Sequence, residues 1–493
     1  MTPTAMGRLP AVLGLLCGLA GCMVGPEYER PQMPTGAGAE FYRAPANWTD
    51  PNAPDAVGAW WRGFKDPEID RLVAEALAKN YDLEAAAATV MEAQALLAQS
   101  HGARLPSAGY SASRTRGKSP SVTPLFPSEA ATAYSQEISI SYIADLFGRL
   151  RRAERAAWAD LWAAQESRQA LAHAIIAQVI RSRVQIAVQQ RLLDVTEATI
   201  RSREATLEVV ERRYPQGLVS PVDVYLAREN ISASRAAAPQ IRQTLMLAQN
   251  SLDVLTGRAP GSGGALPQTL GEMPQAGPAP LAVPGSLLDR RPDVRAAEMQ
   301  LRAATERVGF SVAQMFPDLT LTAAGGYRGD NVDRWVADET QMYSFIMGLA
   351  APLYRGGQLK AGVEAAKARA QRAAANYAKV ILTAMREVED ALAGEQTLQE
   401  RIAFLRVRLD DAMSAESLAV DRYSRGLEGI LTVLETERRR RLAENELILT
   451  QGQLFNARID LYLALGGDWG VANGSVEAAE AQVQEKDTGD QHE

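Results

Sequence analysis

The sequence predicts a mainly helical protein with a small β part, built from two copies of one structural unit. Two long stretches without proline carry apolar residues every seven positions, which indicates coiled-coil helices. Four shorter segments alternate apolar and polar residues, as strands with one apolar face do. Glycines recur 209 residues apart, namely Gly148 and Gly357, Gly217 and Gly426, and Gly257 and Gly466. This ungapped match indicates an internal duplication.

Composition and motifs exclude several classes of function. The 493 residues include 52 Lys and Arg against 59 Asp and Glu, a net charge of −7, which argues against binding nucleic acid through a general basic surface. The three histidines lack metal-ligand spacing, and no phosphate-binding loop, nucleophile elbow or dinucleotide fingerprint occurs. We therefore expect no enzymatic activity, no metal site and no cofactor apart from a covalent lipid.

The first 21 residues read as a lipoprotein signal peptide. Arg8 precedes an apolar run at 11–20, which is too short to span a bilayer. The run ends in Leu-Ala-Gly-Cys22, which resembles the lipobox of bacterial lipoproteins and implies that Cys22 carries the lipid (palmitate) anchor. Cys17 leaves with the signal, so the mature chain can form no internal disulfide. Met23 follows the anchor where an inner-membrane retention signal has Asp, so we expect the outer membrane of a Gram-negative cell.

Each copy is expected to contain a helix, two strands, a long helix and a further helix. An extended, lipid-anchored segment at 22–61 precedes the first copy. Repeat 1 covers 62–256, with strands at about 105–115 and 134–144, a long helix at 148–214 and a helix at 220–256. Repeat 2 covers 285–466, with strands at about 317–327 and 342–354, a long helix at 357–423 and a helix at 429–465. The Gly- and Pro-rich stretch 257–284 is expected to be a linker in an equatorial belt, and 467–493 an acidic, disordered tail.

The long helices should pack on two sides. In repeat 1 one apolar row recurs every seven residues from Val179 to Tyr214, and a second contains Val188, Val195 and Val209. The corresponding row in repeat 2 is interrupted by Glu395. At 1.5 Å per residue such a helix is about 100 Å long, more than a globular domain of this size could bury.

The strand pattern leaves two interpretations open. Ile138, Ile140 and Tyr142 alternate with polar residues, and so do the apolar residues from Tyr343 to Leu353. The pattern alone fits a soluble sheet with one buried face as well as a membrane barrel, and the lipoprotein signal favours the barrel. Four strands cannot close a barrel, and open edges are not tolerated in lipid, so several copies must associate. The pattern does not choose their number.

Several motifs together resemble one family across almost the whole mature chain. They are the segment Cys22-Met23-Val24-Gly25-Pro26-Glu27-Tyr28, Trp60-Trp61, Arg290-Arg291-Pro292-Asp293-Val294, the two Arg-Tyr to Gly-Leu turns, and the ending Ala464-Leu465-Gly466-Gly467. They resemble the outer-membrane factor lipoproteins of tripartite, RND-type efflux pumps (the TolC/OprM-like, NodT family). The resemblance implies a homotrimer with a 12-stranded outer-membrane β-barrel continuous with a 12-helix periplasmic α-barrel. It also implies a periplasmic membrane fusion (adaptor) protein and an inner-membrane RND transporter as partners.

The turns at 215–221 and 424–429 are expected to form the tips of the helical tunnel. By resemblance, Gly217, Leu218, Gly426 and Leu427 match the motif that contacts the adaptor. The alternative is that these glycines only permit the turn.

The resemblance also points to a periplasmic gate near these turns. Asp223 and Tyr423 match two members of a latch between neighbouring hairpins. Glu428 stands where the best-studied non-lipidated member has arginine, so Arg422, Arg425 or Arg213 would have to pair with Asp223 instead. Glu435 matches an acidic ring at the tunnel entrance, whereas Thr432 replaces a second ring, so cations should be favoured less. The alternative is that Glu435 and Glu437 form surface ion pairs with the arginines at 438–441.

Three classes of function follow. The first is a passive exit duct for drugs or other small toxic molecules, and so a part of antibiotic resistance. The second is an outer-membrane duct for type I protein secretion. The third, a periplasmic coiled-coil scaffold, leaves the strand pairs unexplained.

Overall fold

The computed structural model describes residues 23–31, 60–118, 130–264, 266–267, 290–331 and 338–466. Cys22 and the predicted tail lie outside the described residues. The chain forms two compact units. The first comprises Met1–Gln32, Ala88–Gln165 and Ala296–Ala378, and the second Met33–Ala87, Glu166–Arg295 and Lys379–Glu493. Each unit is described by itself below.

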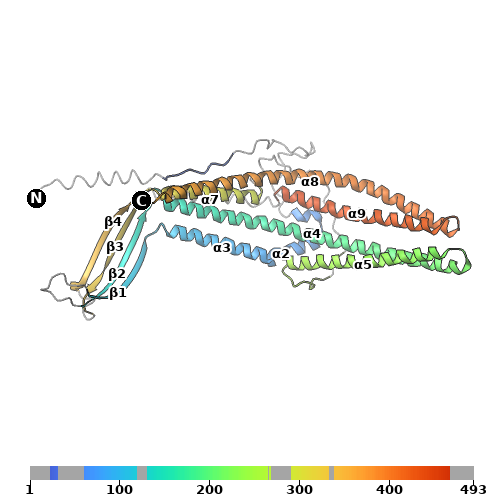
Figure 1. Cartoon of the computed structure of the whole chain (residues 1–493), viewed down its shortest axis with the longest axis horizontal. Coiled ribbons are helices and arrows are strands. Elements are labelled where there is room, and N and C mark those ends of the chain that lie inside the picture. Colours follow the sequence, from blue (N-terminus) through green and yellow to red (C-terminus); the bar gives the residue numbers. More distant parts are fainter. Residues whose placement is uncertain are drawn as a thin grey trace. The chain divides into compact units, whose positions relative to one another are not determined.

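The first unit contains a four-stranded antiparallel sheet in the order β1-β2-β3-β4 (Figure 1). The strands are β1 (Ser107–Lys118), β2 (Ala130–Ala144), β3 (Asp318–Gly329) and β4 (Gln341–Ala350). Each repeat supplies one hairpin, and β2 pairs with β3 across the repeats. β4 ends four residues before the expected position 354, because Pro352 has no N–H for a ladder hydrogen bond. Within the described sheet β1 and β4 are each paired on one side only.

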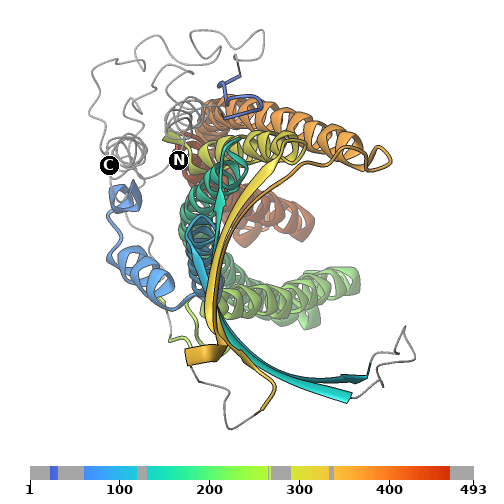
Figure 2. The same cartoon turned by 90° about the vertical axis from the view of Figure 1, so that its left-hand side faces the viewer.

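The sheet is curved (Figure 2). Its two faces differ in chemistry. The register places Ala108, Ile140, Ala323 and Phe345 on one face, next to one another across the four strands. On β2 the side chains of this face, Ile138, Ile140 and Tyr142, are exposed. The opposite face presents Ser139 and Ser141, which are only partly exposed. This difference is what the convex and concave sides of a bent sheet produce, so the apolar face is the convex one.

The helices repeat with the spacing seen in the sequence. The long helices are α4 (Arg149–Arg213) and α8 (Gln358–Ser424), and each is followed by a 35-residue helix, α5 (Pro221–Leu255) or α9 (Ile430–Ala464). Before each hairpin stand α3 (Tyr81–Gly102) and α7 (Pro292–Ala313). The glycines of the 209-residue repeat all have positive φ angles, for example 69° at Gly217 and 72° at Gly426. The two copies therefore turn in the same way at the same places.

An aromatic cluster anchors the core of the second unit. The short 3-10 helix η1 (Trp60–Phe64) and α2 (Pro67–Lys79) precede α3. Trp60 is 1% exposed and stacks on Tyr462 of α9 at 5.2 Å, and Phe64 stacks on Phe455 at 6.0 Å. Asp66 caps α2 by accepting a hydrogen bond from the Glu68 N–H at 2.9 Å. Trp60 and Trp61 therefore belong to a short helix, although they lie inside the segment that we expected to be extended as far as residue 61.

The second apolar row of α4 is shifted by one residue from its predicted course. Val188 and Val195 are buried as expected, but Val209 is 36% exposed and Val210 is fully buried. A straight α-helix drifts by about 20° per heptad relative to a strict seven-residue repeat. Over three heptads this drift moves Val209 off the packed face and brings Val210 onto it.

We expect Gly257→Ala to destabilise the second unit more than Gly261→Ala. Both glycines have positive φ, 71° and 81°, so both substitutions add roughly 1–2 kcal/mol of backbone strain. A Cβ at Gly257 would lie 2.4 Å from the carbonyl oxygen of Lys79, whereas at Gly261 its nearest neighbour is 3.9 Å away. Thermal unfolding of the purified variants measures the difference, and equal midpoints would contradict this account.

Candidate functional site

The two hairpin tips, residues 214–220 and 424–429, have the same backbone design. In the first, Gly217 N–H bonds to the Tyr214 carbonyl at 3.0 Å and Leu218 N–H to Arg213 at 3.2 Å. In the second, Gly426 and Leu427 repeat this pattern with Tyr423 and Arg422 as acceptors. Both glycines adopt the left-handed conformation that the turn requires. Leu218 and Leu427 are 67% and 64% exposed, so each tip presents an uncovered leucine.

Arg213 joins the two tips to each other. Its guanidinium carbon lies 4.9 Å from the centroid of the Tyr423 ring. Its nitrogens donate to the carbonyls of Tyr423 at 3.2 Å and Ser424 at 2.9 Å. Tyr423 is 8% exposed, and this burial raises the pKa of its phenol. Apolar side chains of α4, α5, α8 and α9 pack around it, among them Val210, Val224, Ala419 and Val433.

The structure does not pair Asp223 with an arginine in the described chain. The Asp223 carboxylate instead accepts from the Ser220 N–H at 2.7 Å and completes a capping box at the start of α5. Arg422 faces Glu428 at 3.6 Å, and Arg425 binds Asp421 at 2.9 Å, so both stay in their own hairpin. Among the described residues, the pairing with Asp223 expected of Arg422, Arg425 or Arg213 is therefore not seen.

Glu435 is paired with two arginines one turn along the same helix. Its carboxylate accepts from Arg438 at 2.8 Å and from Arg439 at 2.7 Å. These hydrogen bonds lower the pKa of Glu435 to about 2. For Glu435, the structure therefore has the surface ion pairs that were the alternative to an acidic ring at the tunnel entrance. One carboxylate with two guanidinium groups also leaves the local charge positive.

Glu437 corrects the sequence interpretation, because it is not on the surface. It is 3% exposed and faces Arg203 of α4, itself 2% exposed, at 3.3 Å. Arg203 also donates to the Asn230 carbonyl at 2.6 Å and to the Ser234 hydroxyl at 2.7 Å. A buried ion pair thus links α4, α5 and α9. A helical pattern of charges gave no sign of which glutamate would point inward.

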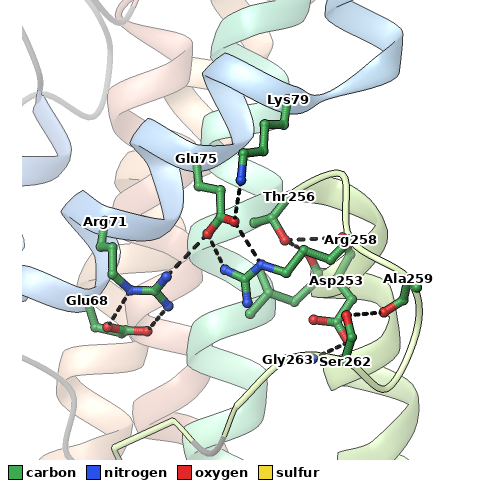
Figure 3. Close-up of polar contacts among 11 residues, drawn as sticks. Glu68, Arg71, Glu75, Lys79, Asp253, Thr256, Arg258, Ala259, Ser262 and Gly263 are labelled. Atoms are coloured by element: carbon green, nitrogen blue, oxygen red, sulfur yellow. Dashed lines mark hydrogen bonds and ion pairs between the residues drawn. The ribbon is translucent and has the colours of Figure 1, made fainter.

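A second cluster of charges, shown in Figure 3, joins α2 to the chain after α5. Glu75 accepts from Arg258 Nε at 2.9 Å, from Arg71 at 3.2 Å and from Lys79 at 3.3 Å. The hydrogen bond with Arg258 is the main reason that the pKa of Glu75 falls to about 2. Asp253 fixes the following turn by accepting from the Gly261 and Gly263 N–H groups.

We expect acid to release residues 257–264 from α2. A carboxylate with a lowered pKa in the folded state stabilises that state above its ordinary pKa of 4.5, and the contribution is lost as the pH falls towards 2. Hydrogen exchange of this segment should therefore accelerate between pH 5 and pH 3 beyond the intrinsic pH effect. Glu75→Gln should remove the added pH dependence, whereas Glu84→Gln, an exposed acid on α3, should keep it. Equal protection factors at both pH values would contradict the assignment.

The segment directly after Cys22 is held in place by contacts within the first unit. Val24 N–H bonds to the Phe147 carbonyl at 3.3 Å, where β2 leads into α4. Tyr28 donates to Glu298 at 3.0 Å, and Arg30 forms an ion pair with the same carboxylate at 3.1 Å. Burial and Glu298 together raise the pKa of Tyr28. Residue 23 is thus fixed next to the end of the sheet that continues into the helices.

A sheet with an exposed apolar face, open edges and long paired helices defines a subunit of an outer-membrane channel. A model of the outer membrane efflux protein family matches residues 72–258 and 283–467, and the chain belongs to this family. It is an outer-membrane protein of efflux systems, from a family of channels and not of enzymes.

Curated relatives and solved structures agree with this assignment. The chain is 31% identical to the solvent efflux pump outer membrane protein SrpC of Pseudomonas putida, over 92% of this chain and 97% of that protein. It is 30% identical to the outer membrane protein OprJ of Pseudomonas aeruginosa, over 92% and 94%. Among solved structures, the outer-membrane channel OprN has a TM-score of 0.84 at 27% identity, covering 91% of this chain and all of that chain. The open-state MtrE channel of Neisseria gonorrhoeae has a TM-score of 0.79 at 26% identity, covering 90% and 98%.

Proposed function

We propose that this chain forms, as a homotrimer, the passive exit duct of a tripartite efflux pump for small toxic molecules. The observation that carries the proposal is the sheet, whose convex face is apolar and exposed. Among the described residues, its edge strands β1 and β4 are each paired on one side only. Unpaired edges are not tolerated in lipid, so β4 of one copy must pair with β1 of the next. Three copies give a barrel of 12 strands, with helices α3, α4, α7 and α8 continuing from it towards the periplasm.

Lipid on Cys22 would hold the trimer to the outer membrane by a second attachment. The contacts of Val24, Tyr28 and Arg30 support this proposal, because they hold the segment after Cys22 near the end of the sheet that continues into the helices. A lipid chain at that position can enter the inner leaflet without stretching the protein.

The hairpin tips would receive a periplasmic membrane fusion (adaptor) protein, which connects the duct to an inner-membrane RND transporter. Gly217 and Gly426 let the backbone of a partner approach closely, and exposed Leu218 and Leu427 offer one apolar contact on each tip. In the closed state Arg213 and Tyr423 would hold the two hairpins of one copy together, and Arg422, Arg425, Asp223 and Glu428 would brace their own turns. Glu435 with its two arginines would make the entrance less cation-selective than an acidic ring would.

A conductance measurement and a deletion test this function. Purified protein in planar bilayers should give discrete channels, and a scaffold protein should give none. Deleting the gene should make cells more sensitive to solvents and antibiotics, which appear in the names of several relatives. The set of secreted proteins should stay unchanged. Loss of a secreted protein with unchanged sensitivity would favour the duct for type I secretion.

A further inference from the structure

The convex face of the sheet changes from apolar to basic along strand β1. In the half of β1 next to α3, this face carries Ala108, Tyr110 and Ala112. In the other half it carries Arg114, Arg116 and Lys118, all three exposed. Because side chains on a strand alternate, these six residues share one face. We call Arg114, Arg116 and Lys118 the basic collar.

The basic collar has no carboxylate beside it in the described sheet. The residues opposite on β2 are Tyr134, Thr132 and Ala130. Glu137, the one acid of β1 and β2, pairs with Ser111 and therefore lies on the concave face. Arg114 lies over the Tyr134 ring, with its guanidinium carbon 5.6 Å from the centroid. That contact orients a cation but does not neutralise it.

The end of the sheet next to the helices is built differently. There Arg149 faces Asp318 at 3.2 Å, and Arg151 faces Asp145 at 3.6 Å. Arg104, just before β1, binds Glu154 at 2.5 Å. Arg104, Arg149 and Arg151 at this end each have a carboxylate partner. Among the described residues, no carboxylate is paired with the three cations of the collar. Three neighbouring cations on one face of β1 favour an anionic ligand at the far end of the sheet.

The strand geometry determines how deep in the membrane the basic collar would lie. Arg114 lies four residues beyond Tyr110, about 13 Å along the strand, and Lys118 lies about 13 Å further. With a strand tilt of about 45° the collar stands roughly 10–20 Å above the Tyr110 level along the membrane normal. Tyr110 is in register with Ile138, Gly325 and Tyr343, the last row of this face that carries several large apolar side chains. The collar thus lies where the hydrocarbon gives way to headgroups.

We propose that the basic collar binds the phosphate groups of the anionic glycolipid in the outer leaflet of the outer membrane. The proposal rests on the proposed function, because the periplasmic direction of the helices makes the opposite end of the sheet extracellular. Two guanidinium groups and an ammonium match a multiply phosphorylated headgroup, and guanidinium groups bind phosphate oxygens in a bidentate fashion. Tyr134 adds an amphipathic ring at the same level, where membrane proteins favour aromatic residues.

The test compares lipid binding of two neutralised variants of the full-length protein. One variant carries Arg114→Gln, Arg116→Gln and Lys118→Gln. The control carries Arg228→Gln, Arg235→Gln and Arg242→Gln, which removes the same charge from exposed arginines of α5. Both are titrated in detergent with a bis-phosphorylated lipid A and with its dephosphorylated form, and bound lipid is counted by native mass spectrometry. Conductance is recorded for the same preparations.

We expect the wild type and the control to bind the phosphorylated lipid at least tenfold more tightly than the dephosphorylated form, and the collar variant to lose this preference. Inorganic phosphate at millimolar concentration should not displace the lipid, and displacement would assign the site to free phosphate and overturn the proposal. Equal lipid binding by wild type and collar variant would overturn it as well. So would a collar variant that fails to assemble without any lipid, because the collar would then pair with acids of a neighbouring copy. Absence of channels in the wild type would instead count against the proposed function.

Discussion

Glu437→Ala should lower the stability of the helical region around the hairpins by about 3–5 kcal/mol, because it leaves the buried Arg203 guanidinium without its counter-ion. Both side chains of the pair are at most 3% exposed. Arg203 would keep its hydrogen bonds to the Asn230 carbonyl and the Ser234 hydroxyl. These acceptors are neutral, so they cannot balance its charge in a medium of low dielectric constant.

Hydrogen exchange of the α9 segment measures this loss at the site itself, and thermal unfolding measures it for the whole chain. Glu437→Gln should cost less, since an amide oxygen can still accept from Arg203. Replacing both partners, with Arg203→Met and Glu437→Leu, should recover much of the stability, because an apolar pair of similar size needs no counter-ion. If the double variant were as unstable as Glu437→Ala, the cost would come from packing and not from an unpaired charge.

The periodicity of apolar residues predicted the helices and strands, because the repeat of a helix or a strand depends on residues that are close in the sequence. The glycine repeat located the turns, and the positive φ angles at Gly148, Gly217 and Gly257 show why glycine is needed there. The structure explains why Glu395 interrupts the heptad pattern of apolar residues. Glu395 is 3% exposed and pairs with Arg458 of α9, a contact 63 residues away that no local pattern could reveal.

The site was less predictable, since charged residues on helices repeat with the same period whether they face water or a neighbour. Glu435 and Glu437 are two residues apart on α9 and have opposite environments. Their separation of about 200° around the helix decides this, but only the positions of α4 and α5 determine which side is buried. The glycines predicted the two turns at Gly217 and Gly426. The Asp223 carboxylate, by contrast, accepts a hydrogen bond from a backbone N–H in its own turn.

Ile140→Lys should prevent or strongly reduce assembly in the membrane, whereas Ser139→Lys, one residue earlier on the same strand, should be tolerated. The strand register places Ile140 between Ala108 and Ala323 on the apolar convex face, so a lysine there would meet hydrocarbon. A lysine on a barrel's lipid face costs up to about 2–4 kcal/mol per chain, depending on its depth, and in a trimer the cost is incurred three times.

Ser139 points to the opposite face, where its neighbours across the strands are Gly109 and Ala324. These small residues leave room for a lysine side chain, and the charge would stand in the water-filled interior. Trimer yield in isolated outer membranes, read as the folded species on a semi-native gel, compares the two variants directly. Both substitutions add the same side chain at almost the same position along β2. The two variants therefore have the same net charge and the same added β-strand propensity, and they differ in the face that carries the lysine. If both variants assembled equally well, the apolar face of the sheet would not be the lipid-facing one, and closure of the barrel by three copies would have to be abandoned.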